Sequence, residues 1–573
     1  MKLIEVAMPL ESINKESRRE KSIRHGHPST LHLWWARRPL AACRAVLFAQ
    51  LVDDPSAWPD RFPTVEAQEA ERKRLFSIIE LLVPWEHTKD EQIMHMARQE
   101  IARSIAWGRG DEVPQSLEQV NRYLRNHGPH IRDPFCGGGS IPLEAQRLGL
   151  PATGSDLNPV AVLISKSTCE FPARFNGLPP VSVQHTSEFP LDRSWTRATG
   201  LASDIEYYAN RMREEAWQRI GHLYPKIRVT DEMAATRTDL QPLVGDELTV
   251  IAWIWARTVA SPDPSLRGLH VPLVRSFDLS TKKGQSAWIE PVVHDDGLGY
   301  DFVVNTGGSK PSQRGTVNRQ GGRCLVSGVA MPFPYIRAEG QAGRIGSRLM
   351  AIVAEGNRRR VFLPPTPAME ALAHEAKPRW KPEGTMPERA LGFRVQEYGM
   401  LKHSDLFTDR QLVALTTFSD LVAEVREEVL RDALTAGMSG DQTPLADGGR
   451  GAVAYADAVA TYLALGIDKA ADYWSAICSW HSSRLMIRNT FARQAIPMIW
   501  DYCEGNPFSG SSGNWLHCCR WVSKVVGVLP ARSGTQVRQA DAAAPQLAEH
   551  EVFATDPPYF DNIGYADLSD YFY

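Results

Sequence analysis

Three consecutive glycines behind an acidic turn are the first feature of the sequence that points to chemistry. Residues 131–140 (IRDPFCGGGS) place Asp133 between a short apolar segment and the glycines, after which a helical pattern begins. Backbone without side chains lets a ligand lie directly against the chain, and the N–H groups that open the next helix point at its polar atoms. A second strand pattern, residues 152–155, ends in Asp156, and an acidic residue there can bind both hydroxyls of a ribose. The spacing is not GxGxxG, so a nicotinamide enzyme is the weaker interpretation. A further alternative is a tight turn between strand and helix that binds no ligand.

A second motif, Asp-Pro-Pro-Tyr at residues 556–559, follows another apolar strand pattern at residues 552–555. A given tetrapeptide of this kind arises by chance in roughly one in several hundred chains of this length. Each motif alone is weak evidence for a functional site. Both, however, follow a short strand pattern, and both place an acidic residue after the carboxyl end of that strand. Accident is therefore a poor explanation for the pair.

Together, the D-P-F-C-G-G-G-S turn, Asp156 and the D-P-P-Y motif resemble those of the amino-group DNA methyltransferases that use S-adenosylmethionine. The opening residues 25–47 (HGHPSTLHLWWARRPLAACRAVL) and the closing residues 556–573 (DPPYFDNIGYADLSDYFY) resemble more closely a bacterial family of adenine-specific DNA methylases containing a zinc ribbon. Members of that family are often associated with phage defence. The resemblance extends over most of the chain, but its specific motifs are confined to residues 8–50, 131–170 and 486–573.

The resemblance implies an α/β fold: a Rossmann-like class I S-adenosylmethionine-dependent methyltransferase sheet, incomplete at the C-terminus, with a large inserted α+β region. It implies transfer of a methyl group to the exocyclic amino group of adenine in a base flipped out of double-stranded DNA. The catalytic residues would be Asp556, Pro557, Pro558 and Tyr559. The residues that bind the S-adenosylmethionine cofactor would be Arg38, Pro39, Asp133, Pro134, Phe135, Cys136, Gly137, Gly138, Gly139, Asp156 and Asp541.

The chemistry expected of the D-P-P-Y motif is the activation of an amino group. An adenine amino nitrogen is a poor nucleophile because its lone pair is delocalised into the ring. The Asp556 carboxylate and the backbone carbonyl of Pro557 can accept its two hydrogens and direct the lone pair at the sulfonium methyl group. Tyr559 offers a ring on which a flipped base can stack, and Phe560 could form a second wall. The family resemblance implies adenine as the target, because Asp at the first motif position goes mostly with adenine, and the amino group of cytosine stays an alternative.

Two further segments would complete the cofactor site. His27-Pro28 and Arg38-Pro39-Leu40 resemble the H-P…K-P-L segment that packs beside the cofactor in related methyltransferases, with Arg in place of Lys. Asp541 either holds the adenine amino group of the cofactor, as its position in such enzymes implies, or is a helix N-cap before Ala542. Residues whose role stays open between the pocket and ordinary core or loop are Trp34, Trp35, Asp561, Asn562 and Tyr565.

The zinc ribbon of the family is not matched in this chain. A ribbon needs two cysteine pairs, whereas the corresponding segments, 261–265 and 324–327, read S-P-D-P-S and C-L-V-S. Cys324 alone could be a ligand. We therefore expect no bound zinc or other metal, and we expect Cys324 to be a small buried residue.

Composition limits the partners and the compartment. The 573 residues carry a net charge of −3, so any DNA-binding surface must be local. Residues 12–28 and Arg358-Arg359-Arg360 are candidate phosphate contacts, or alternatively a solvated helix face and a charged turn. Eight scattered cysteines in a chain of this size indicate reduced thiols in a cytoplasm. No apolar run reaches the ~18 residues that a membrane span needs, so we expect a cytoplasmic protein without a membrane partner.

The motifs must be positioned by elements from the whole chain. We expect an N-terminal family-specific helical segment (1–55), a helical insertion (56–127), the cofactor-binding half of the methyltransferase domain (128–180), an inserted α+β region resembling a target-recognition domain (181–485), and the catalytic half (486–573). Helical patterns lie at 40–52, 64–126, 160–166, 199–224, 410–436, 451–483 and 515–529, and strand patterns lie before Asp133 and at 152–155, 248–305, 535–540 and 552–555.

The sequence shows four strand patterns for this sheet, whereas the family resemblance implies a sheet of seven strands. We therefore expect the chain to be the N-terminal portion of a longer protein or half of a split enzyme. The first functional hypothesis is an active adenine-specific DNA methyltransferase. The alternative is a non-catalytic, or split and partner-completed, DNA-binding subunit of a defence complex, and its partners would then include further defence-system proteins. Methylation of RNA or of a protein amide comes third, and a nicotinamide enzyme is a distant fourth.

Overall fold

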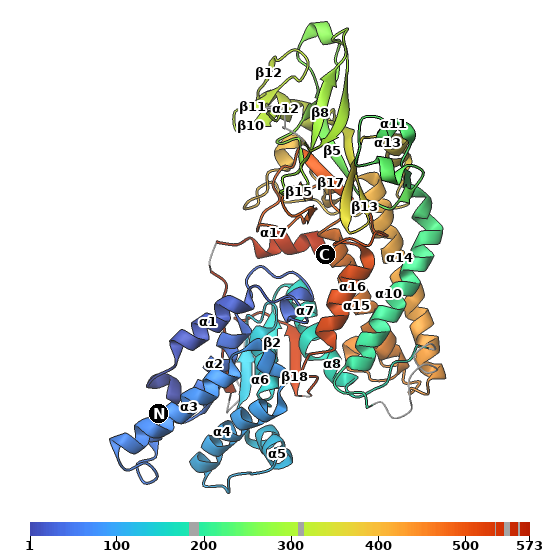
Figure 1. Cartoon of the computed structure of the whole chain (residues 1–573). Coiled ribbons are helices and arrows are strands. Elements are labelled where there is room, and N and C mark those ends of the chain that lie inside the picture. The colour runs from blue at the N-terminus through green and yellow to red at the C-terminus, as the bar shows by residue number, and fades with distance from the viewer. Residues whose placement is uncertain (183–193, 308–313, 533, 544–550, 560–561) are drawn as a thin grey trace.

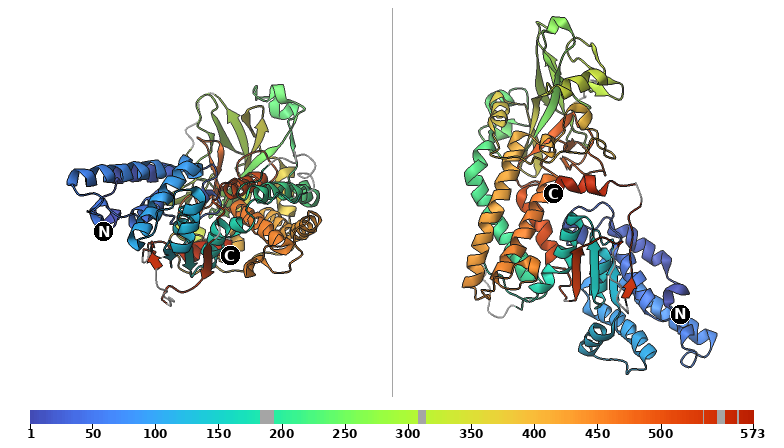
Figure 2. Two further views of the ribbon diagram at one scale, coloured as in Figure 1. Left: turned by 90° about the horizontal axis from the view of Figure 1, so that it is seen from below. Right: turned by 180° about the vertical axis from the view of Figure 1, so that it is seen from behind.

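The computed structural model describes residues 1–182, 194–307, 314–532, 534–543, 551–559 and 562–573, and it has a mixed α/β architecture (Figure 1). A parallel sheet and the N-terminal helices form one end of the molecule, and antiparallel strands from the middle of the chain form the other (Figure 1). Long helices run along one side between the two ends (Figure 2). Segments far apart in the sequence therefore meet in both sheets.

The parallel sheet has the strand order β18-β2-β1-β19. Its strands are β1 (His130–Asp133), β2 (Ala152–Asp156), β18 (Thr535–Gln539) and β19 (Glu551–Phe553), which confirms the four strands expected from the sequence. β1 pairs on both sides, with Ile131 opposite Ala152 and Val552. Because all four strands run parallel, their carboxyl ends meet at one edge of the sheet.

Two helices connect to the carboxyl ends of β1 and β2. Helix α6 (Ser140–Arg147) begins directly after the glycine turn and provides the crossover that parallel neighbours require. Helix α7 (Pro159–Cys169) confirms the helix expected after Asp156. Its N-cap is Asn158, whose side chain accepts the N–H groups of Val160 and Ala161, and proline occupies the first helical position.

The N-terminal helices cover one face of the parallel sheet. They are α1 (Leu10–Glu20), α2 (Leu40–Leu51), α3 (Val65–Leu82), α4 (Glu91–Arg109) and α5 (Leu117–His127), and the last three confirm the helices expected within residues 64–126. Buried side chains of α2, α3 and α4 share one hydrophobic core with Ile131 and Ala152 of the sheet. Helix α4 shows clear end signals, because Asp90 accepts two N–H groups at its start and Gly110 adopts a φ of +73° at its end.

The largest antiparallel sheet has the order β14-β13-β5-β17, with β6 also paired to β5. Its strands are β5 (Val250–Ala260), β6 (His270–Leu273), β13 (Gly346–Gly356), β14 (Arg359–Leu363) and β17 (Asp501–Gly505). The strands expected within residues 248–305 are confirmed. β17 lies after residue 485, where we expect the insertion to end, and yet it pairs with β5 of the insertion. A strand from the C-terminal part of the chain thus completes this sheet.

Smaller sheets surround the large one. They are β7 (Asp278–Ser280) with β8 (Ala287–Val293) and β9 (Tyr300–Thr306), β10 (Val317–Asn318) with β11 (Gly321–Arg323) and β12 (Ala330–Met331), β3 (Ile227–Arg228) with β4 (Glu247–Leu248), and β15 (Ser479–His481) with β16 (Met486–Arg488). The shorter helices are α8 (Phe171–Arg174), α11 (Asp231–Ala234), α12 (Phe333–Gln341), α13 (Pro367–Glu375) and α17 (Tyr565–Ser569).

Long helices pack against one another beside the sheets (Figure 2). They are α10 (Thr199–Ile220), α14 (Asp409–Thr435), α15 (Ala452–Ala471) and α16 (Trp515–Val526), which confirm the helices expected at 199–224, 410–436 and 515–529. The helix expected over 451–483 is wrong after Ala471, where the chain turns away toward β15. The carboxylate of Asp472 holds this turn, because it accepts the Phe491 N–H and the Asn489 side-chain amide. In the described part of the chain, no helix is long and apolar enough to span a membrane.

Candidate functional site

The carboxyl ends of the four parallel strands surround a cavity of about 290 Å³, the strand-end cavity. Open parallel sheets bind ligands at this edge, where loops from neighbouring strands leave a crevice. The sequence-predicted residues that line it are Arg38, Asp133, Pro134, Phe135, Cys136, Gly137, Gly138, Asp156, Asp541, Asp556, Pro557, Pro558 and Tyr559. The glycine turn and the D-P-P-Y motif therefore meet in space, although most of the chain separates them.

Two residues expected to bind the cofactor lie outside the lining of this cavity. Gly139 packs against α7, where an added Cβ would lie 2.9 Å from Ser165 Oγ. This glycine therefore allows a close approach between helices rather than a ligand contact. Pro39 lines a neighbouring cavity instead, because helix α2 begins at the next residue and turns this part of the chain away.

The other two glycines of the turn are required by the segment packed against them. Gly137 has a φ of +49°, and a Cβ there would lie 2.6 Å from Trp34 Nε1. A Cβ on Gly138 would lie 2.9 Å from the Arg37 guanidinium carbon. A side chain is thus excluded by the packing of residues 34–37, and the turn presents bare backbone to the strand-end cavity.

Two carboxylates lie behind the glycine turn. Asp133 is only 2% exposed and accepts hydrogen bonds from Thr555 Oγ1 at 2.9 Å and from one backbone N–H. Burial raises the pKa of Asp133 to about 7. Asp156 accepts the N–H groups of Gly137 and Asn158, both at 2.9 Å, and burial raises its pKa as well. The two groups make the cavity suitable for a cation or for a ligand rich in hydroxyl groups.

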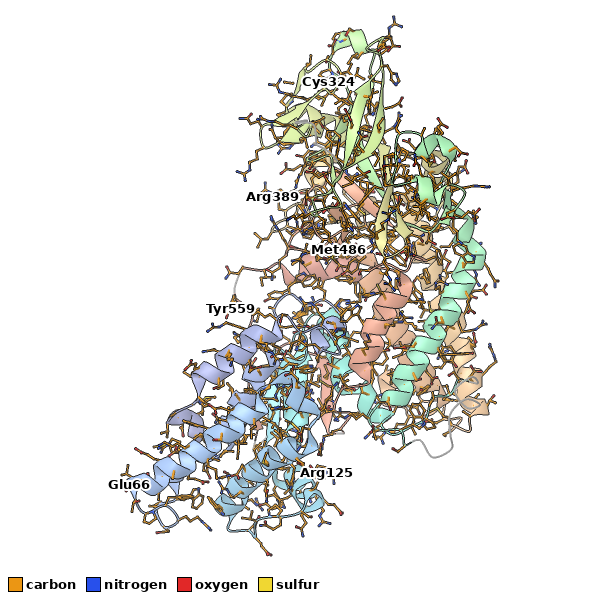
Figure 3. All side chains as sticks on the ribbon, in the orientation of Figure 1. Glu66, Arg125, Cys324, Arg389, Met486 and Tyr559 are labelled. Atoms are coloured by element: carbon orange, nitrogen blue, oxygen red, sulfur yellow. The ribbon has the colours of Figure 1, made fainter. Side chains whose placement is uncertain are left out.

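The D-P-P-Y motif forms another wall of the cavity. Asp556 forms a bidentate ion pair with Arg38, whose Nε and Nη2 atoms donate to the two carboxylate oxygens. The Tyr559 hydroxyl accepts a third hydrogen bond from Arg38 at 3.0 Å, and these contacts, the one with Asp556 first, raise the pKa of Arg38. The Tyr559 side chain is 59% exposed and lies at the surface between the N-terminal helices and α17 (Figure 3). Its ring is open to a stacking partner, whereas both Asp556 oxygens are occupied.

Apolar residues complete the wall. Trp34 stacks on Tyr565 with ring centroids 5.8 Å apart, and both line the cavity, whereas Trp35 lines its neighbour. Leu157, directly after β2, is 68% exposed and Phe135 is also exposed, so a flat apolar ligand would cover both. The lining residues that the sequence did not single out as site residues are Ala36, Ser140, Ile141, Leu157, Asn158, Ala540 and Ala542. Only their position next to the strand ends could have indicated them.

Asp541 lines the cavity beyond β18 and is exposed. Its carboxylate accepts the Ala543 N–H at 2.9 Å, which closes a local turn. The alternative that it caps a helix lies outside the described residues, since 544–550 follow. Phe560 and Asp561 also lie outside the described residues, and the Asn562 N–H donates to the Tyr559 carbonyl.

A second cavity of about 800 Å³, the basic cavity, adjoins the first, and Trp34, Arg38 and Ser140 line both. Its charged residues are Lys21, Arg24, Arg37, Arg38, Lys469 and Arg484 against Glu20, Asp468 and Asp472. Within the described residues, Arg37 and Lys469 have no ion pair and donate only to backbone carbonyls. Burial lowers the pKa of both, that of Arg37 to about 10. The expected basic arm contributes Lys21 and Arg24, and the cavity carries uncompensated positive charge.

The other expected phosphate contact, Arg358-Arg359-Arg360, lies at the hairpin between β13 and β14. Arg359 donates to a backbone carbonyl and Arg360 to Ser511 Oγ, both within the protein. This geometry favours the charged-turn alternative over a DNA contact.

The segments that would hold a zinc ribbon meet in space. Ser261 Oγ lies 3.3 Å from Cys324 Sγ, and the Ser327 N–H donates to the same sulfur at 3.4 Å. Cys324 is buried, and hydroxyl groups stand beside it where a ribbon would have thiolates. Across the described ranges, no group of three or more His, Cys, Asp or Glu side chains is arranged to hold a metal ion.

Comparison with known proteins leaves the activity open. A family model described as a protein of unknown function (DUF1156) matches residues 7–78, the segment that contributes Trp34 and Arg38 to the strand-end cavity. No curated protein and no solved structure matches the chain. The function must therefore be inferred from the site itself.

Proposed function

We propose that the chain is an S-adenosylmethionine-dependent DNA methyltransferase that transfers a methyl group to the exocyclic amino group of adenine. The observation that carries this proposal is the convergence of the glycine turn and the D-P-P-Y motif on one cavity at the carboxyl edge of a parallel sheet. A Rossmann-like class I methyltransferase sheet accounts for both the strand directions and the position of the cavity. We propose further that the enzyme acts in the cytoplasm, in a phage-defence or restriction–modification context.

The residues of the strand-end cavity fit this cofactor. Asp156 keeps acceptor capacity beyond its two backbone N–H bonds and would hold the ribose hydroxyls. Asp541 would accept from the adenine amino group, while Leu157 and Phe135 would cover the adenine ring. When bound, the cofactor supplies an electrophilic methyl group on a positively charged sulfur. The acidic lining suits that charge.

The protein's part in the reaction is to position the target amino group. The Asp556 carboxylate and the Pro557 carbonyl each accept one amino hydrogen, and the lone pair of the nitrogen is then directed at the methyl group. Tyr559 holds the flipped base by stacking. The transfer would be a direct displacement helped by orientation: the bond between nitrogen and methyl forms as the bond between sulfur and methyl breaks, and the neutral thioether leaves. The Asp556 carboxylate would take the surplus proton of the methylated amino group. No covalent intermediate with the protein is needed.

Arg38 has to release Asp556 before the base can bind, because it occupies both carboxylate oxygens. Arg38 can exchange this partner for the carboxylate of the cofactor, which is an equally good bidentate acceptor. We therefore infer an ordered reaction in which the methyl donor binds before the target base.

The basic cavity supports DNA as the substrate. Arg37 and Lys469 form no ion pair in the described part of the chain and are both partly exposed, and phosphate groups are the matching ligands. The basic cavity shares Arg38 with the strand-end cavity, so a backbone held there would bring a flipped nucleotide close to Tyr559.

Mass spectrometry of nucleosides from DNA incubated with the purified chain and the methyl donor tests this proposal. We expect methylated adenine from the wild type and a loss of about a hundredfold or more in rate for Asp556→Ala. Donor affinity, measured by calorimetry, should change little in that variant. Asp570→Ala removes an exposed carboxylate from the same C-terminal segment and should remain active. Absence of donor binding in the wild type would overturn the proposal.

The second candidate is a non-catalytic or partner-completed DNA-binding subunit of a defence complex. The Arg38–Asp556 ion pair favours it, because this pair occupies both oxygens of the carboxylate that would accept an amino hydrogen. In that case the purified chain would bind the donor or DNA but transfer no methyl group until a partner protein is added.

A further inference from the structure

A third cavity, of about 470 Å³, lies where the residues preceding β2 and β18 meet helices α4, α5 and α6. We call it the arginine cavity, because five separate segments contribute its arginines: Arg98, Arg125, Arg147, Arg197 and Arg532. The acidic residues of its lining are Glu91 and Glu118. It shares no lining residue with the strand-end cavity, and Figure 3 shows Arg125 well apart from Tyr559.

Two of these arginines are almost completely buried, since 2% of the Arg98 side chain and 3% of the Arg147 side chain are exposed. Arg98 donates to the Arg147 carbonyl through Nε at 3.1 Å and Nη2 at 2.9 Å. Arg147 donates through Nε to Glu144 and through Nη1 to the Thr88 carbonyl. Its remaining nitrogen, Nη2, is buried and has no hydrogen-bond partner among the described residues. A buried charged donor without an acceptor is costly, so this atom indicates a missing ligand.

The acidic residues do not balance the charge of the cluster. Glu91 accepts from both Arg98 and Arg532 and thus serves two guanidinium groups at once. In the described ranges, Arg125 and Arg197 have no ion pair; Arg197 donates only to a backbone carbonyl, at 3.4 Å. Among the described residues, the cavity therefore holds two arginines without an acidic partner and two more that share one carboxylate.

The pKa values of the buried arginines also indicate that an anion would be favoured in this cavity. Burial, followed by repulsion from Arg532, lowers the pKa of Arg98 to about 10. Burial also lowers the pKa of Arg147 and of Arg532. A lowered pKa means that the protonated form is destabilised by its surroundings, and an anion in the cavity would relieve this.

We propose that the arginine cavity is a binding site for a small phosphate-bearing ligand, either inorganic phosphate or the phosphate groups of a free nucleotide. Guanidinium groups bind phosphate oxygens in bidentate geometry, and five converging arginines match a multiply charged anion. Gln146 Oε1 lines the same cavity as a buried acceptor without a partner, which suits a hydroxyl group of the ligand. DNA does not fit, because Arg98 and Arg147 lie inside the protein, beyond the reach of duplex phosphates.

This site would act on the same helix as the strand-end cavity. Helix α6 starts at the glycine turn and ends at Arg147, so a ligand bound to Arg147 would hold the far end of the helix that supports the turn. Phosphate binding itself is independent of methyl transfer, and its test does not require an active enzyme.

Calorimetry on the full chain with inorganic phosphate, pyrophosphate and ATP tests the proposal, with sodium chloride at equal ionic strength as the reference. We expect saturable binding of at least one of these anions. Arg125→Ala/Arg197→Ala removes the two unpaired arginines and leaves the buried ones in place, so affinity should fall about tenfold or more while the fold is kept. Arg122→Ala, an exposed arginine on the same helix outside the cavity, is the matched control and should bind like the wild type.

Arg125→Glu is a second test of the proposal, because it reverses one charge at the mouth of the arginine cavity and leaves Arg98 and Arg147 unchanged. It should weaken the anion more than Arg125→Ala does. Equal binding by the wild type and the double variant, or a response that follows ionic strength alone, would overturn the proposal. So would binding of a short DNA duplex that is lost in the double variant and that phosphate and ATP do not compete with. Preference for ATP over phosphate would identify the free nucleotide as the source of the phosphate groups.

Discussion

The parallel sheet and the large antiparallel sheet differ in where their acidic side chains lie and in how these side chains are paired. At the carboxyl edge of the parallel sheet, Asp133 and Asp156 line the strand-end cavity without an ion pair among the described residues, and Asp556 is paired only with the partly exposed Arg38. In the antiparallel sheet, Glu504 of β17 is buried against Arg410 of α14 in a bidentate pair at 2.8 and 3.0 Å. The first arrangement keeps acidic groups where a ligand can reach them, whereas the second neutralises its charge inside the core.

The strands differ in the same sense. β5 and β13 each have 11 residues, most of them buried, and their stability comes from apolar surface removed from water. β1 has 4 residues, ends in Asp133 and is followed by the glycine turn. The buried apolar surface that stabilises the fold and the residues of the candidate site are therefore concentrated in different sheets. Substitutions in the antiparallel sheet should therefore mainly lower stability, and substitutions at the parallel edge should mainly change ligand binding.

The largest effect should come from Arg410→Met. The substitution leaves the Glu504 carboxylate buried without its partner, which costs about 3–5 kcal/mol of unfolding free energy. Arg410→Met/Glu504→Leu removes both charges and should recover most of that loss. Arg219→Met breaks an exposed pair with Glu424 and should cost less than about 1 kcal/mol. Denaturant unfolding followed by circular dichroism measures all three, and equal losses for Arg410→Met and Arg219→Met would contradict the comparison.

The second prediction concerns the pH dependence caused by Asp133. Its pKa rises from 3.8 in the unfolded chain to about 7 in the folded one, so the folded state holds a proton that the unfolded state releases. The stability gained in this way is fully present below about pH 4 and is lost as the pH rises through about 7. Asp133→Asn is neutral throughout, so its advantage over the wild type should grow toward pH 8, to about 4 kcal/mol at most.

Thermal unfolding of the wild type and Asp133→Asn across this range measures the effect. The Thr555 hydroxyl can still donate to the amide oxygen in the variant, so the structure around it should be kept. Asp60→Asn, at an exposed position, should leave the profile unchanged. Parallel profiles for Asp133→Asn and the wild type would mean that the carboxylate is ionised in the folded protein at all these pH values.

The parts of this picture that depend on neighbouring residues were predictable from the sequence. The strand, glycine turn and helix around residues 131–147 and the strand before Asp556 follow from local patterns, and the structure has them. The meeting of the glycine turn with the D-P-P-Y motif was expected only through the family resemblance, because no local pattern records which distant segments meet, and other contacts of this kind were not predictable. Pairing of β17 with β5, the ion pair of Arg38 with Asp556 and the packing of Arg37 on Gly138 are of this kind.

The third prediction tests the bare backbone of the glycine turn. In Gly137→Ala the new Cβ would meet Trp34 Nε1 at 2.6 Å and the residue would keep a φ of +49°, at a strain of about 1–2 kcal/mol. We expect donor affinity, measured by calorimetry, to fall about tenfold, and we expect the strain to lower the free energy of unfolding by a similar amount. Gly108→Ala, in helix α4 with no atom within 4 Å of the new Cβ, should leave binding unchanged and stabilise the helix slightly. Unchanged donor affinity in Gly137→Ala would remove the turn from the site.

The smallest effect on stability, and the sharpest test of the site, should come from Arg38. Its pair with Asp556 is partly exposed, so Arg38→Ala should change the unfolding free energy by less than about 1 kcal/mol. Donor affinity should nevertheless fall about tenfold, because the cofactor carboxylate would lose a charge-assisted partner. Arg38→Lys keeps the charge but cannot form the bidentate pair, so it should retain most of the donor affinity and free Asp556 for the base. If the Arg38→Ala and Arg38→Lys variants bind the donor equally well, Arg38 acts only on Asp556. The proposed exchange of the Asp556 carboxylate for the cofactor carboxylate is then wrong.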